Sequence, residues 1–195
     1  LILNIKIIKL KDNPILILID IQKAFQESDY PGIVRNNPNA ELVCGKILNF
    51  WRSKKLPLVH VRHSSIYSDS KLHKSKKGFE FNDYVMPLNN EKIITKNVNS
   101  AFIDTNLKSI LDEQNISKVV IVGMTTNHCI SSTVRMSANY GYETYLVSDS
   151  TACFNTEGIN GKIIHCENVY ETSIANLNKE FAEEIVDYYI EDNFK

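Results

Sequence analysis

The amino-acid sequence predicts an α/β fold in which helices cover both faces of a parallel sheet. Apolar runs of strand length alternate along the chain with amphipathic helical stretches, and this order is typical of parallel strands joined by helical crossovers. The apolar runs are also continuous, as expected for strands that are covered on both faces. The chain has 195 residues and 43% hydrophobic content, so we expect one domain over residues 1–195 with a full core.

The first half of the chain contains two predicted strands, one predicted helix and a long loop. An apolar run at 15–20 follows a proline and predicts the first strand. A helix is predicted over 38–54, because a proline can occupy its first turn and its apolar residues share one face. A second strand is predicted over 56–61. A polar loop then extends over 63–90.

The second half continues the same alternation. A short strand is predicted over 92–96, and Asp104 can cap the helix that follows it. Two more strands are predicted over 118–122 and 143–148. The helix between them covers 130–140 and is closed by a glycine.

The two ends of the chain give weaker patterns. Residues 157–177 can be helical, and 181–189 have a helical pattern but could instead supply a short edge strand. Lysines interrupt the apolar N-terminus, which is too short to span a bilayer and a poor signal peptide. We interpret residues 1–13 as an additional edge segment or as a remnant of cloning that lacks its first Met.

Composition excludes several classes of function. Lys and Arg total 22 against 23 Asp and Glu, a formal charge of −1, so we expect neither nucleic acid nor a membrane surface as a partner. The histidines show no metal-binding spacing, and we expect no metal or cofactor. Reduced thiols in the cytoplasm are the simplest interpretation of the four cysteines, whose scattered spacing suits neither a zinc site nor a disulfide framework: Cys44, Cys129, Cys153 and Cys166.

Three residues with side chains suited to catalysis lie where predicted strands end. Asp20 ends the first strand, Lys96 ends the third, and Cys129 follows the fourth at a helix N-terminus, a position that favours a thiolate. Each alone has a commoner explanation: a turn cap, a solvated edge charge or helix packing. Ligands of parallel α/β sheets bind beyond the carboxyl ends of the strands, so the coincidence of all three predicts an acid, a cation and a nucleophile in one site.

Sequence motifs around these residues resemble the isochorismatase-like cysteine hydrolase superfamily, which includes nicotinamidases, N-carbamoylsarcosine amidases and streptothricin hydrolases. The resemblance covers nearly the whole chain from Pro14. It rests on blocks that occur in the family's order: I-L-I-L-I-D-I-Q-K-A-F at 15–25, H-V-R-H at 60–63, I-T-K-N-V-N-S-A-F at 94–102, V-I-V-G-M-T-T-N-H-C-I-S-S-T at 120–133 and V-S-D-S-T-A at 147–152.

The resemblance implies a three-layer α/β/α, Rossmann-like sandwich with a mostly parallel six-stranded sheet, usually assembled as homodimers or larger homo-oligomers. It implies a catalytic triad of Asp20, Lys96 and Cys129. It also implies a cis peptide bond between Met124 and Thr125, and an oxyanion hole formed by the backbone N–H groups of Thr125 and Cys129.

Four further side chains are candidates for the wall of a small-molecule pocket. Gln22 and Phe25 lie just beyond Asp20, and Phe102 ends the motif that contains Lys96. His128 is a poor candidate base for the adjacent thiol, because neighbouring residues on a helix face different directions. The pocket candidates are Gln22, Phe25, Phe102 and His128.

Departures from the family pattern narrow the predicted reaction. Nicotinamidases carry a metal-binding D-x-H and a further histidine after the second strand, whereas this chain has H-V-R-H-S-S at 60–65, which argues against a bound metal and against nicotinamidase activity. True isochorismatases lack the nucleophilic cysteine and hydrolyse a vinyl ether. Cys129 therefore favours hydrolysis of a small amide or related C–N bond through a thioester. Two alternatives remain: a thiol redox protein that uses Cys129, and a catalytically silent binding module on the same fold.

Overall fold

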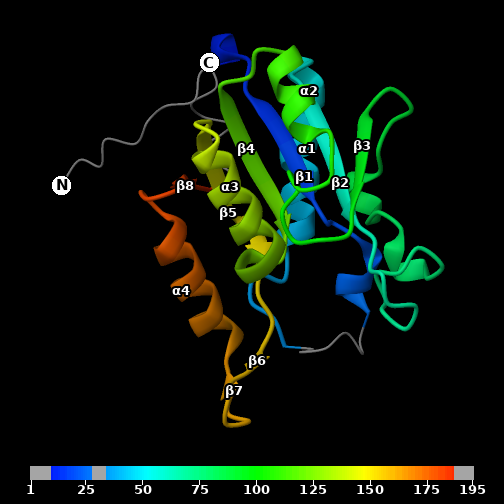
Figure 1. Ribbon diagram of the computed structural model, residues 1–195, viewed down its shortest axis with the longest axis vertical. Coiled ribbons are helices and arrows are strands. Elements are labelled where there is room, and N and C mark those ends of the chain that lie inside the picture. Colours follow the sequence, from blue (N-terminus) through cyan, green and yellow to red (C-terminus); the bar gives the residue numbers. More distant parts are fainter. Residues whose placement is uncertain (1–9, 28–33, 187–195) are drawn as a thin grey trace.

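A computed structural model describes residues 10–27 and 34–186 of the chain (Figure 1). Its main feature is one sheet of six strands, all parallel to their neighbours, in the spatial order β3-β2-β1-β4-β5-β8. The strands are β1 (Ile15–Ile19), β2 (Leu58–His63), β3 (Lys92–Lys96), β4 (Lys118–Met124), β5 (Glu143–Ala152) and β8 (Glu183–Ile185).

Helices cover both faces of this sheet, which confirms the predicted three-layer α/β/α class (Figure 1). α1 (Ala40–Lys54) packs on one face, and three helices pack on the other: α2 (Leu107–Glu113), α3 (Ser131–Asn139) and α4 (Cys166–Leu177). The apolar run of β1 is unbroken because both faces of this strand are covered by helices. Its odd-numbered residues, such as Ile17, join the core beneath α2, α3 and α4, and its even-numbered residues, such as Leu18, join the core beneath α1.

Short helical turns and a small hairpin complete the described chain. Three of the turns lie next to strand ends. The other two, η3 and η4, lie within the long loop after β2, which was predicted over 63–90. These elements are η1 (Leu10–Asp12), η2 (Lys23–Gln26), η3 (Lys77–Phe79), η4 (Asp83–Val85), the π-helical turn η5 (Thr126–Ile130), β6 (Thr156–Glu157) and β7 (Ile163–Ile164).

The prediction that Asp104 caps a helix is wrong. α2 begins at Leu107, three residues later, and Asn106 stands at its N-cap. The hydroxyl of Thr105 accepts a hydrogen bond from the Leu107 amide at 3.2 Å and satisfies one N–H group of the first turn. Asp104 itself has a left-handed backbone, with φ of 53°.

The prediction of a helix over 157–177 is wrong in its first part. A β6–β7 hairpin precedes α4, which begins only at Cys166. Two glycines make the turn: the amide of Gly158 donates to the Lys162 carbonyl at 2.9 Å, and Gly161 has φ of 72°, a conformation that few side chains tolerate.

The structure answers in part the two predictions that the sequence leaves open at the ends of the chain. Of the two alternatives for 181–189, the edge strand is confirmed for the described residues, because β8 pairs in parallel with β5. Residues 187–189 lie outside the description. The N-terminal segment 1–13 was expected to be an additional edge segment or a cloning remnant; its described part contains the η1 turn, and residues 1–9 lie outside the described chain.

A partly buried ionic cluster ties α1 to β2 and to the loop before β3. Arg52 donates two hydrogen bonds of 2.8 Å to the two carboxylate oxygens of Glu91, and His60 Nε2 lies 2.9 Å from Glu91 Oε2. Burial by itself raises the pKa of Glu91, but hydrogen bonds from Arg52, the Leu88 amide and His60 outweigh it and lower this pKa to about 2. The carboxylate therefore stays charged at neutral pH.

The strand order creates a crevice at one edge of the sheet. From β1 the chain moves outward through β2 and β3, and it then returns to the other side of β1 to form β4 and β5. Crossovers diverge at this switch point, so they leave an opening beyond the carboxyl ends of β1 and β4. Asp20 follows β1 and Cys129 follows β4, so both lie at this opening.

Candidate active site

Asp20, Lys96 and Cys129 come together beyond the carboxyl ends of three strands. The ammonium of Lys96, the last residue of β3, donates hydrogen bonds to Asp20 Oδ2 at 2.6 Å and to Cys129 Sγ at 3.2 Å. A third hydrogen bond runs from this ammonium to the Val98 carbonyl at 3.1 Å. The ion pair is buried, since the side chains of Lys96 and Asp20 are 0% and 1% exposed. One cation thus contacts both an acid and a thiol.

Unusual backbone conformations position two of these groups. Asp20 has φ of 51°, and aspartate is among the few residues that tolerate this region. Gly123 has φ of 131°, and a Cβ atom there would lie 1.9 Å from the Ile19 carbonyl oxygen, so only glycine fits between β4 and β1. The peptide bond between Met124 and Thr125, for which the resemblance implies a cis geometry, is cis in the structure.

The thiol of Cys129 is protonated in this resting arrangement. Burial raises its pKa above the ordinary value, the Asp20 carboxylate raises it further, and the Lys96 ammonium offsets only part of the increase. The helix N-terminus is expected to favour a thiolate, whereas burial and the neighbouring Asp20 carboxylate act in the opposite direction in the resting site. The second oxygen of Asp20, Oδ1, is buried and accepts no hydrogen bond from the described residues.

A cavity of about 350 Å³ opens onto the thiol. Of the four predicted pocket residues, Phe25 and His128 line it. The Phe25 ring stacks on Phe154 with 6.2 Å between centroids. The full lining consists of Asp20, Phe25, His63, Leu72, Asn99, Thr125, His128 and Cys129.

His128 is held in place at the cavity wall through both ring nitrogens. Its Nδ1 lies 3.1 Å from the Thr125 hydroxyl and its Nε2 lies 3.2 Å from the Asn127 side-chain amide. Burial lowers the pKa of His128, so the ring is neutral at neutral pH. These contacts make His128 a fixed wall of the cavity.

The other two predicted pocket residues, Gln22 and Phe102, do not line the cavity. Gln22 is fully buried, and its amide is used by backbone groups: it donates to the carbonyls of His63 and Phe79 at 3.0 and 2.9 Å and accepts from the His63 amide at 2.8 Å. Phe102 belongs to the core, where its ring lies 5.3 Å from Tyr140 between centroids.

His63, Leu72 and Asn99 line the cavity although sequence reasoning did not select them. His63 ends β2, next to β1, so the rule that selected Asp20 could also have selected it. Its Nδ1 lies 3.4 Å from Lys96 Nζ, and burial, followed by the Lys96 charge, lowers the pKa of its ring. Leu72 and Asn99 lie in loops, whose position over the sheet no local pattern reveals.

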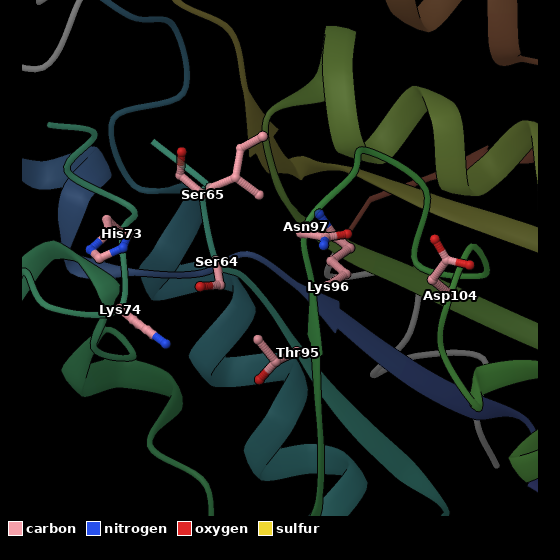
Figure 2. A pocket seen from close by; sticks show the side chains of 9 residues that line it. Ser64, Ser65, His73, Lys74, Thr95, Lys96, Asn97 and Asp104 are labelled. Carbon is pink, nitrogen blue, oxygen red and sulfur yellow. The ribbon is translucent and has the colours of Figure 1, made fainter. Parts of the chain in front are cut away.

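A second cavity of about 430 Å³ is lined mainly by polar residues. Figure 2 shows Lys96 and Asn97 near its centre, with Lys74 and Asp104 on opposite sides. Thr95, at the exposed edge of β3, accepts a hydrogen bond from Arg62 at 3.1 Å. This cavity shares Lys96 with the candidate site, while its other lining residues belong to the neighbouring loops and strand edge.

Within the described residues, one set of side chains has metal-ligand character. The ligand atoms of Asp20, His63 and Cys129 all lie within 4.8 Å of one another. All four cysteines are free thiols. Among residues 10–27 and 34–186, no helix has the length and apolar character needed to cross a membrane.

The fold and this site define a parallel α/β/α enzyme with a cysteine at the sheet's switch point. Residues 14–183 match the family model described as the isochorismatase domain. The protein belongs to the isochorismatase family, which places it among hydrolases and confirms the family resemblance.

Known relatives agree over most of the chain. The isochorismatase family protein YrdC of Bacillus subtilis is 41% identical over 89% of this chain and 91% of its own length. An isochorismatase-family structure from Chromobacterium violaceum is 34% identical, with a TM-score of 0.87 and 92% of each chain covered. Nicotinamidase 3 of Arabidopsis thaliana is 29% identical over 47% of this chain and 41% of its own length.

Proposed function

We propose that the protein hydrolyses a small amide or related C–N bond through a thioester on Cys129. The observation that carries the proposal is the position of Lys96 Nζ, 2.6 Å from the Asp20 carboxylate and 3.2 Å from the Cys129 sulfur, beside a cavity. A thiol, a base and a fixed cation are the groups that covalent acyl transfer requires. The partial likeness to nicotinamidase 3, whose name denotes an amidase, supports the amide class.

The first half-reaction forms the thioester. Asp20 Oδ1, which accepts no hydrogen bond from the described residues, takes the proton from the thiol as Sγ attacks the substrate carbonyl carbon. The backbone N–H groups of Thr125 and Cys129 donate to the resulting oxyanion. Asp20 then gives its proton to the leaving nitrogen as the C–N bond breaks.

The second half-reaction releases the product. Asp20 accepts a proton from a water molecule, whose oxygen attacks the thioester carbonyl, and the C–S bond then breaks. The carboxylic acid leaves, and the proton on Asp20 returns to the sulfur. The Lys96 ammonium stays between the two groups throughout and stabilises whichever of them carries the negative charge.

The cavity suits a small substrate. Its volume of about 350 Å³ lies near the lower end of the range for ligand pockets, roughly 300–1,000 Å³. Phe25 and Leu72 contribute apolar parts of its wall, and Asn99 and His128 contribute polar groups. We therefore propose an amide or ureide of a small molecule as substrate. We also propose that the protein acts in the cytoplasm, the setting that its scattered cysteines favour, and that it assembles as a homodimer or larger homo-oligomer, as the resemblance implies.

The direct test screens small amides and ureides and compares wild type with Cys129→Ala. We expect Cys129→Ala to lower kcat by about a thousandfold or more, because it removes the nucleophile. Mass spectrometry of quenched wild-type turnover should detect an acyl adduct on Cys129. Cys166→Ala is the matched control and should retain activity, because this buried cysteine begins α4 and lines neither of the two cavities described above.

Substantial turnover by a folded Cys129→Ala variant would refute the mechanism. A stable disulfide on Cys129 after peroxide treatment, with no acyl adduct from any amide, would favour the thiol redox alternative. Absence of both turnover and adducts over the whole screen would favour the silent binding module.

A further inference from the structure

Three different metal-ligand groups surround a single cation in this structure. The cation is the Lys96 ammonium, whose nitrogen lies 2.6 Å from Asp20 Oδ2, 3.2 Å from Cys129 Sγ and 3.4 Å from His63 Nδ1. Carboxylate oxygen, thiolate sulfur and imidazole nitrogen are the ligands of zinc, and sites with three protein ligands keep a fourth position open. Here that open side is the cavity, which all three groups line.

We propose that Asp20, His63 and Cys129 form a latent site for Zn²⁺ or a similar soft divalent cation, which competes with the Lys96 ammonium and blocks the nucleophile. The inference goes beyond the proposed function, since the hydrolysis proposed above uses no metal. A metal here would inhibit the protein, whereas metal-dependent enzymes are activated by theirs.

The competition follows from distances and charge. Zinc binds oxygen and nitrogen at about 2.0–2.1 Å and sulfur at about 2.3 Å, so the three groups would move inward by roughly 1 Å from their positions around the ammonium. A dication and an ammonium repel each other, and the ammonium must leave before the metal is held. The metal also replaces the proton on Sγ, which is released to solvent.

His63 is already fixed at the position that a ligand needs. Its backbone amide and carbonyl are both hydrogen-bonded to the Gln22 side chain, at 2.8 and 3.0 Å. The backbone that carries the ring is thus held by a buried side chain. Ligand groups held in this way lose little freedom on metal binding.

The test titrates metal-free protein with Co²⁺ as a spectroscopic probe for Zn²⁺ and follows the sulfur-to-cobalt charge-transfer band in the near ultraviolet. We expect Lys96→Met to bind Co²⁺ at least about tenfold more tightly than wild type. In the Lys96→Met background, Cys129→Ala should abolish the band, and His63→Gln should weaken binding about tenfold or more. His73→Gln is the matched control, because His73 lies on the loop that follows His63 and lines the second cavity (Figure 2).

A measurement on wild type covers the possibility that Lys96→Met fails to fold. Zn²⁺ at about 1 mM should slow iodoacetamide alkylation of Cys129 at least about fivefold, and a chelator should restore the rate. Alkylation unaffected by Zn²⁺, or a Co²⁺ band that survives Cys129→Ala, would overturn the proposal. None of these readouts requires turnover, so this inference and the proposed hydrolysis fail independently.

Discussion

At the residue scale, Asp20 has two opposite effects on Cys129. As a neighbouring anion it raises the pKa of the thiol, in addition to the larger effect of burial. As the proposed base it removes the thiol proton during catalysis. A single substitution at this position therefore separates the two effects.

We predict that Asp20→Asn makes Cys129 more reactive toward iodoacetamide while it eliminates turnover. The neutral amide removes the anion that opposes ionisation, so the thiolate paired with Lys96 becomes more populated at pH 7. Each unit of decrease in the thiol pKa increases the thiolate fraction about tenfold while the thiol form predominates. Alkylation rates resolved by peptide mapping provide the measurement.

The other three cysteines serve as internal controls for this experiment. They are 0% to 5% exposed and should stay slow in both proteins. Slower alkylation of Cys129 in Asp20→Asn would contradict the assignment of its raised pKa to the carboxylate.

Residue positions relative to strand ends could be predicted from the sequence, whereas side-chain directions could not. Asp20, Lys96 and Cys129 each follow or end an apolar run, and parallel topology alone implies that such positions share one edge of the sheet. Gln22 follows the same strand, yet its amide turns inward to the His63 backbone. That direction depends on a partner 41 residues away, which no local pattern reports.

At the element scale, the pairing of β1 with β4 depends on the absence of a side chain at Gly123. Gly123 pairs with Ile19 in the sheet and has no room for a Cβ atom. We predict that Gly123→Ala costs more than about 3 kcal/mol of folding free energy, because it combines a left-handed backbone with a clash against main chain. Urea denaturation measures this difference.

Gly141→Ala is the matched control for this prediction. Its φ of 86° is also left-handed, but a Cβ atom there would meet nothing within 4 Å. The control should cost only about 1–2 kcal/mol, the price of the backbone conformation itself. Equal losses in both variants would show that crowding against Ile19 is unimportant.

Element types were predictable where periodicity was long, and less so where turns were short. β1 and α1 follow directly from an unbroken apolar run and an amphipathic face. The sequence does not predict the β6–β7 hairpin, because each of its strands has only two residues. Nothing in the pattern of apolar residues separates this segment from α4, which follows it. β5 also extends to Ala152, beyond the predicted end at residue 148, because a bulge opposite Ile121 and Gly123 shifts its register and lets pairing resume at Thr151.

At the scale of the whole molecule, acid should weaken the fold through the cluster of Arg52, His60 and Glu91. The pKa of Glu91 is about 2 in the folded protein against an ordinary value of 4.5. The unfolded chain therefore takes up this proton first as the pH falls. The stability that Glu91 contributes is fully present above about pH 4.5 and is lost between there and about pH 2.

We predict that Glu91→Gln lowers the free energy of unfolding by about 1–3 kcal/mol at pH 7, because it breaks a partly buried, charge-assisted pair. The difference from wild type should shrink as the pH falls through that window, since protonation then neutralises Glu91 in wild type as well. Denaturant titrations at several pH values measure it. Glu113→Gln, at an exposed position of α2, is the control, and a difference that stays constant with pH would contradict the assignment.

The three-layer class could be predicted for the whole molecule because it depends on repeated local patterns. The cluster of Arg52, His60 and Glu91 could not, since its members lie on a helix, a strand and a loop and meet only in the finished fold. Assembly into a homodimer or larger homo-oligomer and the single domain over 1–195 stay predictions.

The contacts of Lys96 span 76 residues to Asp20 and 33 to Cys129, so the three side chains meet only after four strands have docked in order. A partly folded chain can bury apolar surface and gain helix, yet it holds no sulfur beside a carboxylate. Recovery of catalytic rate after dilution from denaturant would therefore report completion of the sheet, later than signals from helix content alone.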